Sequence, residues 1–226
     1  MKQIKILHLY YDLLNLYGEN ANVRALTNAL EKQNIEVLVD FKSINEKINI
    51  SNYDFIYLGS GSDENYNIVD NDFEKYTNDF KKYIDNNGFV LATGNSLDLF
   101  SKVLNYESKK IDFRIVGEQV YTFKNIKELV IGFQNRDSVI YEVSEDNLFE
   151  VKVGTGFEPN KIQEGITKNN FYGTYLLGPL LIRNPYFLKY LVKSLLESKE
   201  IKYEELEKDI SYKAYDEFIK NFVDNK

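Results

Sequence analysis

The sequence predicts an α/β fold with a doubly wound, largely parallel central sheet and an antiparallel or mixed extension. In the first half, compact apolar strands alternate with amphipathic helical segments, as in parallel sheets covered by helices on both faces. In the second half, short strands follow one another with only turn residues between them. No repeat or low-complexity linker divides the 226 residues. We therefore expect one domain over residues 1–226.

The first half contains four expected strands and two expected helices. The strands cover residues 4–10, 36–41, 55–58 and 89–92, each rich in β-branched or aromatic side chains. The first helix covers residues 20–33 and the second residues 73–84, because their apolar residues recur at helical spacing. The sequence Asn86-Asn87-Gly88 is a typical helix end.

The second half contains shorter expected strands and two further helices. The strands cover residues 119–123, 129–133, 139–143, 148–153 and 171–176. A helix is expected over residues 185–198, with Pro185 in its first turn. A last amphipathic helix is expected over about residues 203–224, because Leu206, Ile210, Tyr215 and Ile219 fall at helical intervals.

Composition excludes several classes of function. The formal net charge is −7 and no block of basic residues occurs, so we expect no nucleic acid as partner. No apolar run approaches the roughly 20 residues of a membrane-spanning helix, and the N-terminus lacks the pattern of a signal peptide. We therefore expect a cytoplasmic protein without membrane insertion.

The chain has no cysteine and a single histidine, His8. Disulfides, thiolate metal sites and thiol catalysis are excluded. His8 lies inside the first expected strand, where we interpret it as a core or sheet-edge residue rather than a catalytic base. We expect neither a cofactor nor a metal.

Three segments carry a resemblance to a known family. They are the sequence Leu13 to Asn22 (LLNLYGENAN), the glycine-rich sequence Leu58 to Asp63 (LGSGSD), and the sequence Gly173 to Pro179 (GTYLLGP). In this order and spacing they resemble the CobB/CobQ-like class I glutamine amidotransferases, and within them the GatD-like glutaminase subunit of lipid II isoglutaminyl synthase. The resemblance covers nearly the whole chain and implies a flavodoxin-like three-layer sandwich.

The resemblance also implies a mechanism and a partner for active members of the family. A cysteine at a sharp strand-to-helix turn attacks the glutamine amide, and a histidine accepts its proton. The glycine-rich loop supplies backbone N–H groups to the oxyanion. The released ammonia reaches a Mur-ligase-like partner, resembling MurT, that amidates lipid II.

This chain departs from the family at both catalytic positions. In the sequence Leu91-Ala92-Thr93-Gly94-Asn95, Thr93 stands where the family has its cysteine, and Leu177 stands where it has its histidine. An alcohol without a base is a very weak nucleophile. A β-branched residue is also poorly suited to positive φ. We expect no glutamine hydrolysis and an ordinary negative φ at Thr93.

Some positions of the family's site can still bind a ligand. By resemblance, Arg114 binds a carboxylate. The residues Gly59, Ser60, Gly61 and Gly94 are expected to form the backbone of a site that binds an anion. The alternative for Arg114 is a surface arginine, or one paired with a local acid such as Glu118. The alternative for the glycine-rich loop is a tight turn that needs glycine for its dihedral angles. Gly132-Phe133-Gln134-Asn135 fits a further family pattern that Arg136 breaks.

Two functions remain open at this point, with a third less supported. The first is a catalytically inactive subunit, a pseudo-glutaminase that binds or regulates a MurT-like ligase. The second is a module that binds an amino acid such as glutamine or glutamate, or a peptidoglycan fragment. The third, an amidase with an unrecognised site, has no paired catalytic constellation in the sequence to support it.

Overall fold

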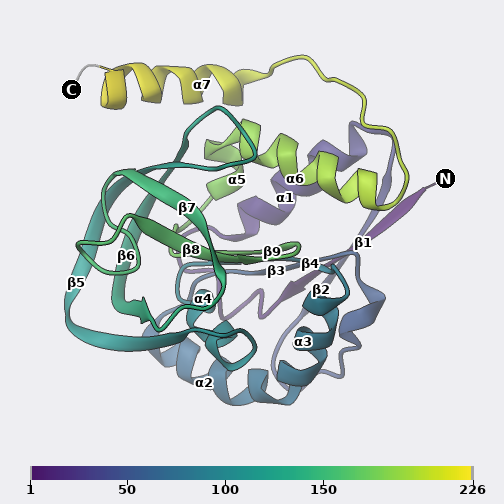
Figure 1. Ribbon diagram of the computed structural model, residues 1–226. Coiled ribbons are helices and arrows are strands. Elements are labelled where there is room, and N and C mark those ends of the chain that lie inside the picture. Colours follow the sequence, from purple (N-terminus) through teal and green to yellow (C-terminus); the bar gives the residue numbers. More distant parts are fainter. Residues whose placement is uncertain (1, 225–226) are drawn as a thin grey trace.

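The computed structural model describes residues 2–224, and these form one nine-stranded sheet between two layers of helices (Figure 1). The strand order is β2-β1-β3-β4-β9-β8-β7-β5-β6. The strands are β1 (Gln3–Leu9), β2 (Glu36–Lys42), β3 (Phe55–Leu58), β4 (Phe89–Thr93), β5 (Glu107–Thr122), β6 (Val130–Tyr141), β7 (Asp146–Val153), β8 (Gln163–Lys168) and β9 (Phe171–Thr174).

The first five strands in this order, β2-β1-β3-β4-β9, are parallel, as predicted. Every residue of β3 and β4 is buried, which explains why these strands are continuous apolar runs rather than alternating ones. The apolar side chains of the parallel half belong to two cores, one on each face of the sheet. The expected α/β fold is therefore confirmed.

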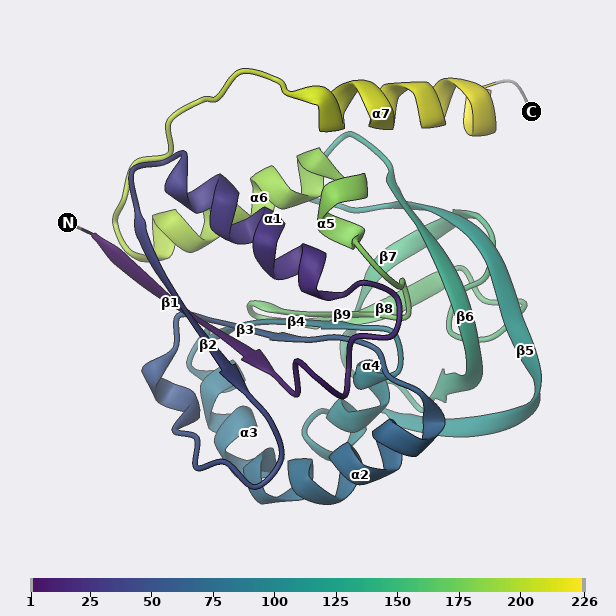
Figure 2. The same ribbon diagram turned by 180° about the vertical axis from the view of Figure 1, so that it is seen from behind.

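Helices cover both faces. One layer contains α1 (Asn20–Glu31), α5 (Leu180–Arg183) and α6 (Pro185–Ser198), and the other contains α2 (Asp63–Phe73), α3 (Thr77–Asp85) and α4 (Ser96–Leu99) (Figures 1 and 2). Short 3₁₀ turns at Ile50–Asn52, Glu74–Tyr76 and Phe100–Lys102 complete the connections. No helix within residues 2–224 has the length and apolar character needed to cross a bilayer.

The second half of the sheet is antiparallel and strongly curled (Figure 2). The curl brings β6 back over the end of β9, where the N–H of Leu177 donates to the carbonyl of Phe133 at 2.9 Å. The two strands expected at 129–133 and 139–143 are one strand, β6. Its middle looked like a loop because Gln134, Arg136 and Ser138 are polar, yet all three are buried.

Two helix predictions need correction. The helix expected at 73–84 begins at Thr77, and α2, which precedes it, was not predicted because only Val69, Asp72 and Phe73 of its side chains are buried. The C-terminal helix begins at Ile210 rather than at 203. It consists of α7 (Ile210–Phe218) and a π-helical end (Ile219–Asp224).

The late start of α7 has a local cause. Asp209 has extended backbone angles and its side chain accepts the N–H of Ser211 at 3.0 Å, which is an N-cap. Residues 201–209 therefore contain no helix or strand and form a strap that arches over α1 and α6 (Figure 2).

His8 is a core residue, as the sequence indicated. It is fully buried in β1 and its ring lies 5.2 Å from that of Tyr57 and 5.8 Å from that of Phe41, measured between centroids. Burial lowers its pKa to about 4, so the ring is neutral at physiological pH. It does not line the cavity described next.

Candidate functional site

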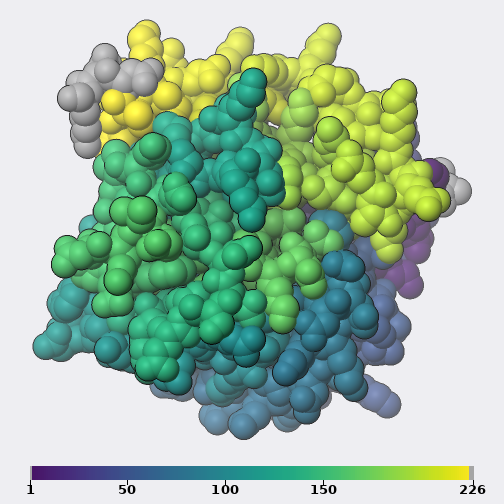
Figure 3. All heavy atoms as spheres, viewed as in Figure 1, coloured from purple at the N-terminus to yellow at the C-terminus, as the bar shows by residue number. Residues whose placement is uncertain are grey.

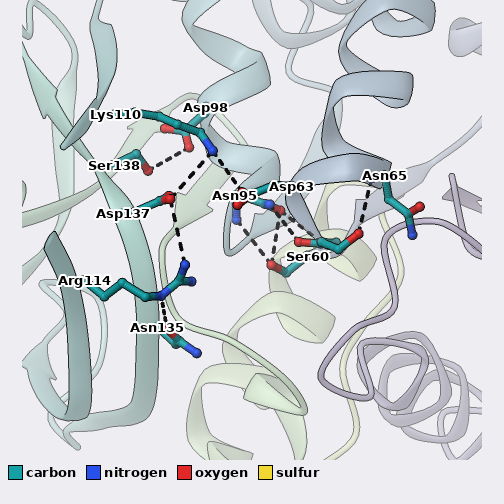
Figure 4. Close-up of polar contacts among 12 residues, drawn as sticks. Ser60, Asp63, Asn65, Asn95, Asp98, Lys110, Arg114, Asn135, Asp137 and Ser138 are labelled. Atoms are coloured by element: carbon teal, nitrogen blue, oxygen red, sulfur yellow. Dashed lines mark hydrogen bonds and ion pairs between the residues drawn. The ribbon is translucent and has the colours of Figure 1, made fainter. Parts of the chain in front are cut away.

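The candidate site lies at the carboxyl ends of the parallel strands, where ligands of open α/β sheets bind. The loops that follow β1, β3, β4 and β9 meet there, and β5 and β6 close one side around a cavity of about 240 Å³ (Figure 4). Its lining includes Ser60, Gly61, Gly94, Asn95, Arg114, Asn135, Asp137 and Leu177. A larger hollow of about 620 Å³ lies at the amino ends of β3 and β4 and contains none of these residues.

The buried carboxylate of Glu19 holds three of these loops together. It accepts the N–H of Tyr17 at 2.8 Å and the N–H of Gly178 at 3.1 Å. A side chain at Gly59 would lie 2.5 Å from the Glu19 Cγ, so only glycine allows this approach. Burial raises the pKa of Glu19, although the backbone N–H donors act in the opposite direction.

The strand-to-helix turn after β4 has its left-handed residue at Gly94, with φ of +61°, and not at Thr93. The expected absence of positive φ at Thr93 is confirmed. The Thr93 side chain is fully buried, and its Oγ1 shares a hydrogen bond of 2.8 Å with the hydroxyl of Tyr57. Thr93 does not line the cavity. The left-handed residue of this turn, or elbow, is thus Gly94, one residue after Thr93, and it has no side chain.

The space above Gly94 is filled. A Cβ built at this position would lie 2.5 Å from the Cβ and Oγ of Ser60 and 2.7 Å from Cδ2 of Leu177. Leu177 is itself buried and lines the cavity. The position expected to hold the family's histidine therefore faces the elbow, but it presents a methyl group that cannot accept a proton.

The glycine-rich loop is already hydrogen-bonded to Asn95. The Oδ1 atom of Asn95 accepts the N–H of Gly61 at 3.0 Å, and its Nδ2 donates to the carbonyl of Gly61 at 2.8 Å. The Ser60 hydroxyl also donates to Oδ1, at 3.1 Å. Because the N–H of Gly61 has a partner within the protein, it is not a free donor for an oxyanion or another anion.

Arg114 belongs to a continuous chain of polar contacts along the opposite wall (Figure 4). Its Nε donates to Oδ1 of Asn135 at 2.9 Å, and its guanidinium lies 3.8 Å from the carboxylate of Asp137. Asp137 also lies 3.6 Å from Nζ of Lys110, which in turn binds Asp63 at 2.9 Å. Arg114 lines the cavity, but it is half exposed and pairs with a local acid, Asp137, as the alternative to a carboxylate clamp expected; Glu118 pairs with Arg183.

Behind this wall lies a buried polar cluster that the sequence did not reveal. Glu164 accepts the hydroxyl of Thr174 at 2.9 Å and the N–H of Tyr175 at 2.9 Å, and burial raises its pKa to about 7. Asp98 accepts the hydroxyls of Tyr175 at 2.6 Å and Ser138 at 2.8 Å, and burial raises its pKa to about 6.

Arg136 is the cation of this cluster. Its guanidinium lies 4.2 Å from the ring centre of Tyr175 and donates to the carbonyls of Ser138 and Gly156. These residues are separated along the chain, so no local pattern indicates their proximity. Because Arg136 is fully engaged within the fold, it has a structural role beside the cavity.

The cavity presents polar side chains and Leu177, and its lining contains no thiol or imidazole. Within the described part of the chain, no three Asp, Glu or His side chains gather closely enough to hold a metal ion. The cavity is lined by amide, hydroxyl, guanidinium and carboxylate groups, which suit binding of a polar ligand rather than nucleophilic attack on an amide.

Comparisons with known proteins agree with this geometry. The chain is 28% identical over 234 residues to subunit GatD of lipid II isoglutaminyl synthase (glutamine-hydrolyzing) from Streptococcus pneumoniae (strain ATCC BAA-255 / R6), covering 96% of this chain and 87% of the relative. It is 27% identical over 224 residues to the subunit of the same name from Staphylococcus aureus (strain N315), covering 92% and 91%. The predicted resemblance is confirmed. No protein-family model matches the chain.

Solved structures share the fold at low sequence identity. The structure of PurLQS from Thermotoga maritima superposes with a TM-score of 0.61 at 13% identity, covering 88% of this chain and all of that chain. A glutamine amidotransferase from the same organism gives 0.55 at 10% identity, covering 95% and 89%. The fold is that of class I glutamine amidotransferases.

The filled elbow predicts the cost of adding a side chain at position 94. Gly94→Ala should lower the free energy of unfolding by about 2–4 kcal/mol, because strain at positive φ adds to overlap with Ser60 and Leu177. Gly18→Ala is the matched control. It has φ of +82° but no atom within 4 Å of the added Cβ, so it should lose only about 1 kcal/mol. Urea denaturation measures both, and equal losses would contradict the crowding described here.

Glu164 predicts a pH dependence of stability. Its pKa is about 7 in the fold against 4.5 for the free side chain, so the folded protein binds the proton more tightly between these values. The free energy of unfolding should therefore fall as pH rises from about 4.5 to 7 and level off above.

Glu164→Gln removes this titration and should reduce that fall by about 2–3 kcal/mol. Denaturation at pH 5 and pH 8 measures the difference, with the exposed Glu31→Gln as control. Asp98 still titrates in the variant, so part of the slope persists. A slope that is the same in variant and parent would show that Glu164 keeps an ordinary pKa.

Proposed function

We propose that this chain is a glutamine amidotransferase-type subunit that does not hydrolyse glutamine and that binds and supports a Mur-ligase-like partner in lipid II amidation. The observation that carries the proposal is the elbow: Gly94 has no side chain, and Ser60 and Leu177 fill the space where a nucleophile would lie. No cysteine exists elsewhere in the sequence to replace it.

The partner is proposed from the relatives. Both curated relatives are subunits of a larger enzyme, and both match this chain over almost its full length. The loops that carry the resemblance have a defined arrangement here, because the buried Glu19 connects them. A fold kept in this detail without its chemistry favours a role in binding. The resemblance names a MurT-like ligase as the partner. Because this ligase depends on ATP, we expect such a complex to lie in the cytoplasm.

Two measurements on the full chain test the proposal. Purified protein should release no glutamate from L-glutamine above the rate of a protein-free blank, under conditions in which the Streptococcus pneumoniae relative is active. The tagged chain, purified from its native host, should bring down a Mur-ligase-like protein identifiable by mass spectrometry. Glutamine hydrolysis that increases with the concentration of this chain would overturn the proposed inactivity. Purification without a Mur-ligase-like protein would overturn the proposed partner.

A second candidate function rests on the cavity wall. Arg114 is half exposed, and the two carboxylates of Asp137 and Asp63 line the same cavity. The carboxylate of a zwitterionic amino acid can bind Arg114, and its ammonium group can bind Asp137 and Asp63. The same wall would suit the end of a peptidoglycan peptide. In this reading the chain is a binding module for glutamine, glutamate or such a fragment.

Thermal unfolding distinguishes this second candidate. If L-glutamate or L-glutamine binds, a concentration tenfold above the Kd should stabilise the fold by about 1.4 kcal/mol, which raises the melting temperature by about 3–6 °C. Arg114→Gln should abolish the rise, whereas Lys124→Gln, at an exposed position outside the cavity, should not. No rise with either amino acid or with a muramyl peptide at millimolar concentration removes this candidate.

A further inference from the structure

Another cavity lies under the C-terminal strap, between α1 and α6, and shares no lining residue with the candidate site. Its volume is about 460 Å³, within the range that holds a small organic ligand. One wall is α1, whose small side chains recur every four residues, and the other is α6, with the strap above. The lining combines charged and polar residues with aliphatic ones, among them Ala21, Ala25, Ala29, Leu188, Val192 and Leu206.

The strap spans this cavity rather than filling it. The N–H of Glu204 donates to Oε1 of Gln33 at 2.7 Å, and Nε2 of Gln33 donates to the carbonyl of Glu204 at 2.8 Å. At its other end Asp209 binds Lys32 at 3.1 Å. Between these anchors most strap residues are exposed. The space-filling view shows the strap and α7 as a ridge along this side of the molecule (Figure 3).

Aliphatic side chains surround the cavity mouth. Ile210 is 76% exposed and Ile182 is 45% exposed, and both line the cavity. Ile210 is the most exposed of the large hydrophobic side chains in the described chain. Exposed aliphatic groups around a hollow with a partly aliphatic lining indicate a surface that gains free energy when an apolar group covers it.

The charged lining residues define one end of the ligand. Arg24, Lys32 and Lys189 outnumber Glu207 and Asp209. Lys32 is paired with Asp209, and Lys189 with Glu205. Among the described residues, Arg24 and Glu207 are the charged lining residues without an ion pair or hydrogen-bond partner, and Arg24, on α1, is exposed. Its guanidinium can bind a carboxylate or phosphate through two parallel hydrogen bonds.

We propose that this cavity binds a single-chain anionic amphiphile, with its alkyl chain between α1 and α6 and its carboxylate or phosphate on Arg24. The aliphatic part of the lining supplies most of the binding free energy, and the guanidinium selects for a charged head group. The site is independent of the lost amidase chemistry, because it shares no lining residue with the cavity around Gly94.

Isothermal titration of the full chain with decanoate, decyl phosphate and decanol tests this proposal. All three are used below their aggregation limits. Saturable binding of one molecule of decanoate or decyl phosphate, about tenfold tighter than decanol, is expected. The acid that binds more tightly identifies the head group. No saturable binding, several equivalent sites, or decanol binding as tightly as the acids would overturn the proposal.

Variants locate the site. Ala25→Leu fills the cavity and Arg24→Gln removes its free cation; each should weaken decanoate binding by about tenfold or more. Lys193→Gln, an exposed α6 position outside the lining, should not change it. If Ala25→Leu fails to fold, Leu206→Gln on the strap replaces it, because that side chain is only half buried. The assignment would be contradicted if decanoate affinity is unchanged both in Arg24→Gln and in the lining variant that folds, Ala25→Leu or Leu206→Gln.

Discussion

One buried carboxylate determines how the loops of this protein are arranged. Glu19 accepts backbone N–H groups from its own loop and from the loop after β9, and it lies against Gly59 in the loop after β3. A buried hydrogen-bonding group left without its partner costs about 1–3 kcal/mol, so these segments are held in place together. This constraint acts on the backbone and does not depend on any catalytic side chain. The arrangement of the loops around the cavity can therefore persist whatever side chains line it.

The polar groups of the remnant site are satisfied within the protein itself. The Asn95 amide pairs with both backbone groups of Gly61, and Ser60 and Leu177 pack over Gly94. In an active site, such groups are held ready for charge that develops during the reaction. Here they bond to one another, and Arg136 interacts electrostatically with the buried carboxylates of Asp98 and Glu164.

The parallel half of the fold could be predicted because its strands are buried on both faces and read as apolar runs. The antiparallel half was harder. The middle of β6 is polar in sequence, but Gln134, Arg136 and Ser138 find partners inside the protein. Likewise, α2 was hard to predict because it has few buried side chains. The strap at residues 201–209 continues the helical pattern of α7, but the helix begins only after Asp209, its N-cap. In each case a tertiary contact or a local cap outweighed the periodicity of the residues.

The sequence by itself determined that no thiol can act here, because no cysteine occurs in it, and it located the loops that would have surrounded one. It also singled out Arg114, which lines the cavity in the structure. Only the tertiary structure decided that the left-handed turn falls on Gly94 and that Ser60 and Leu177 occupy the space above it. The reason is physical: residues 60, 94 and 177 meet only after the strands align, and side-chain overlap between them leaves no periodic signal in the chain.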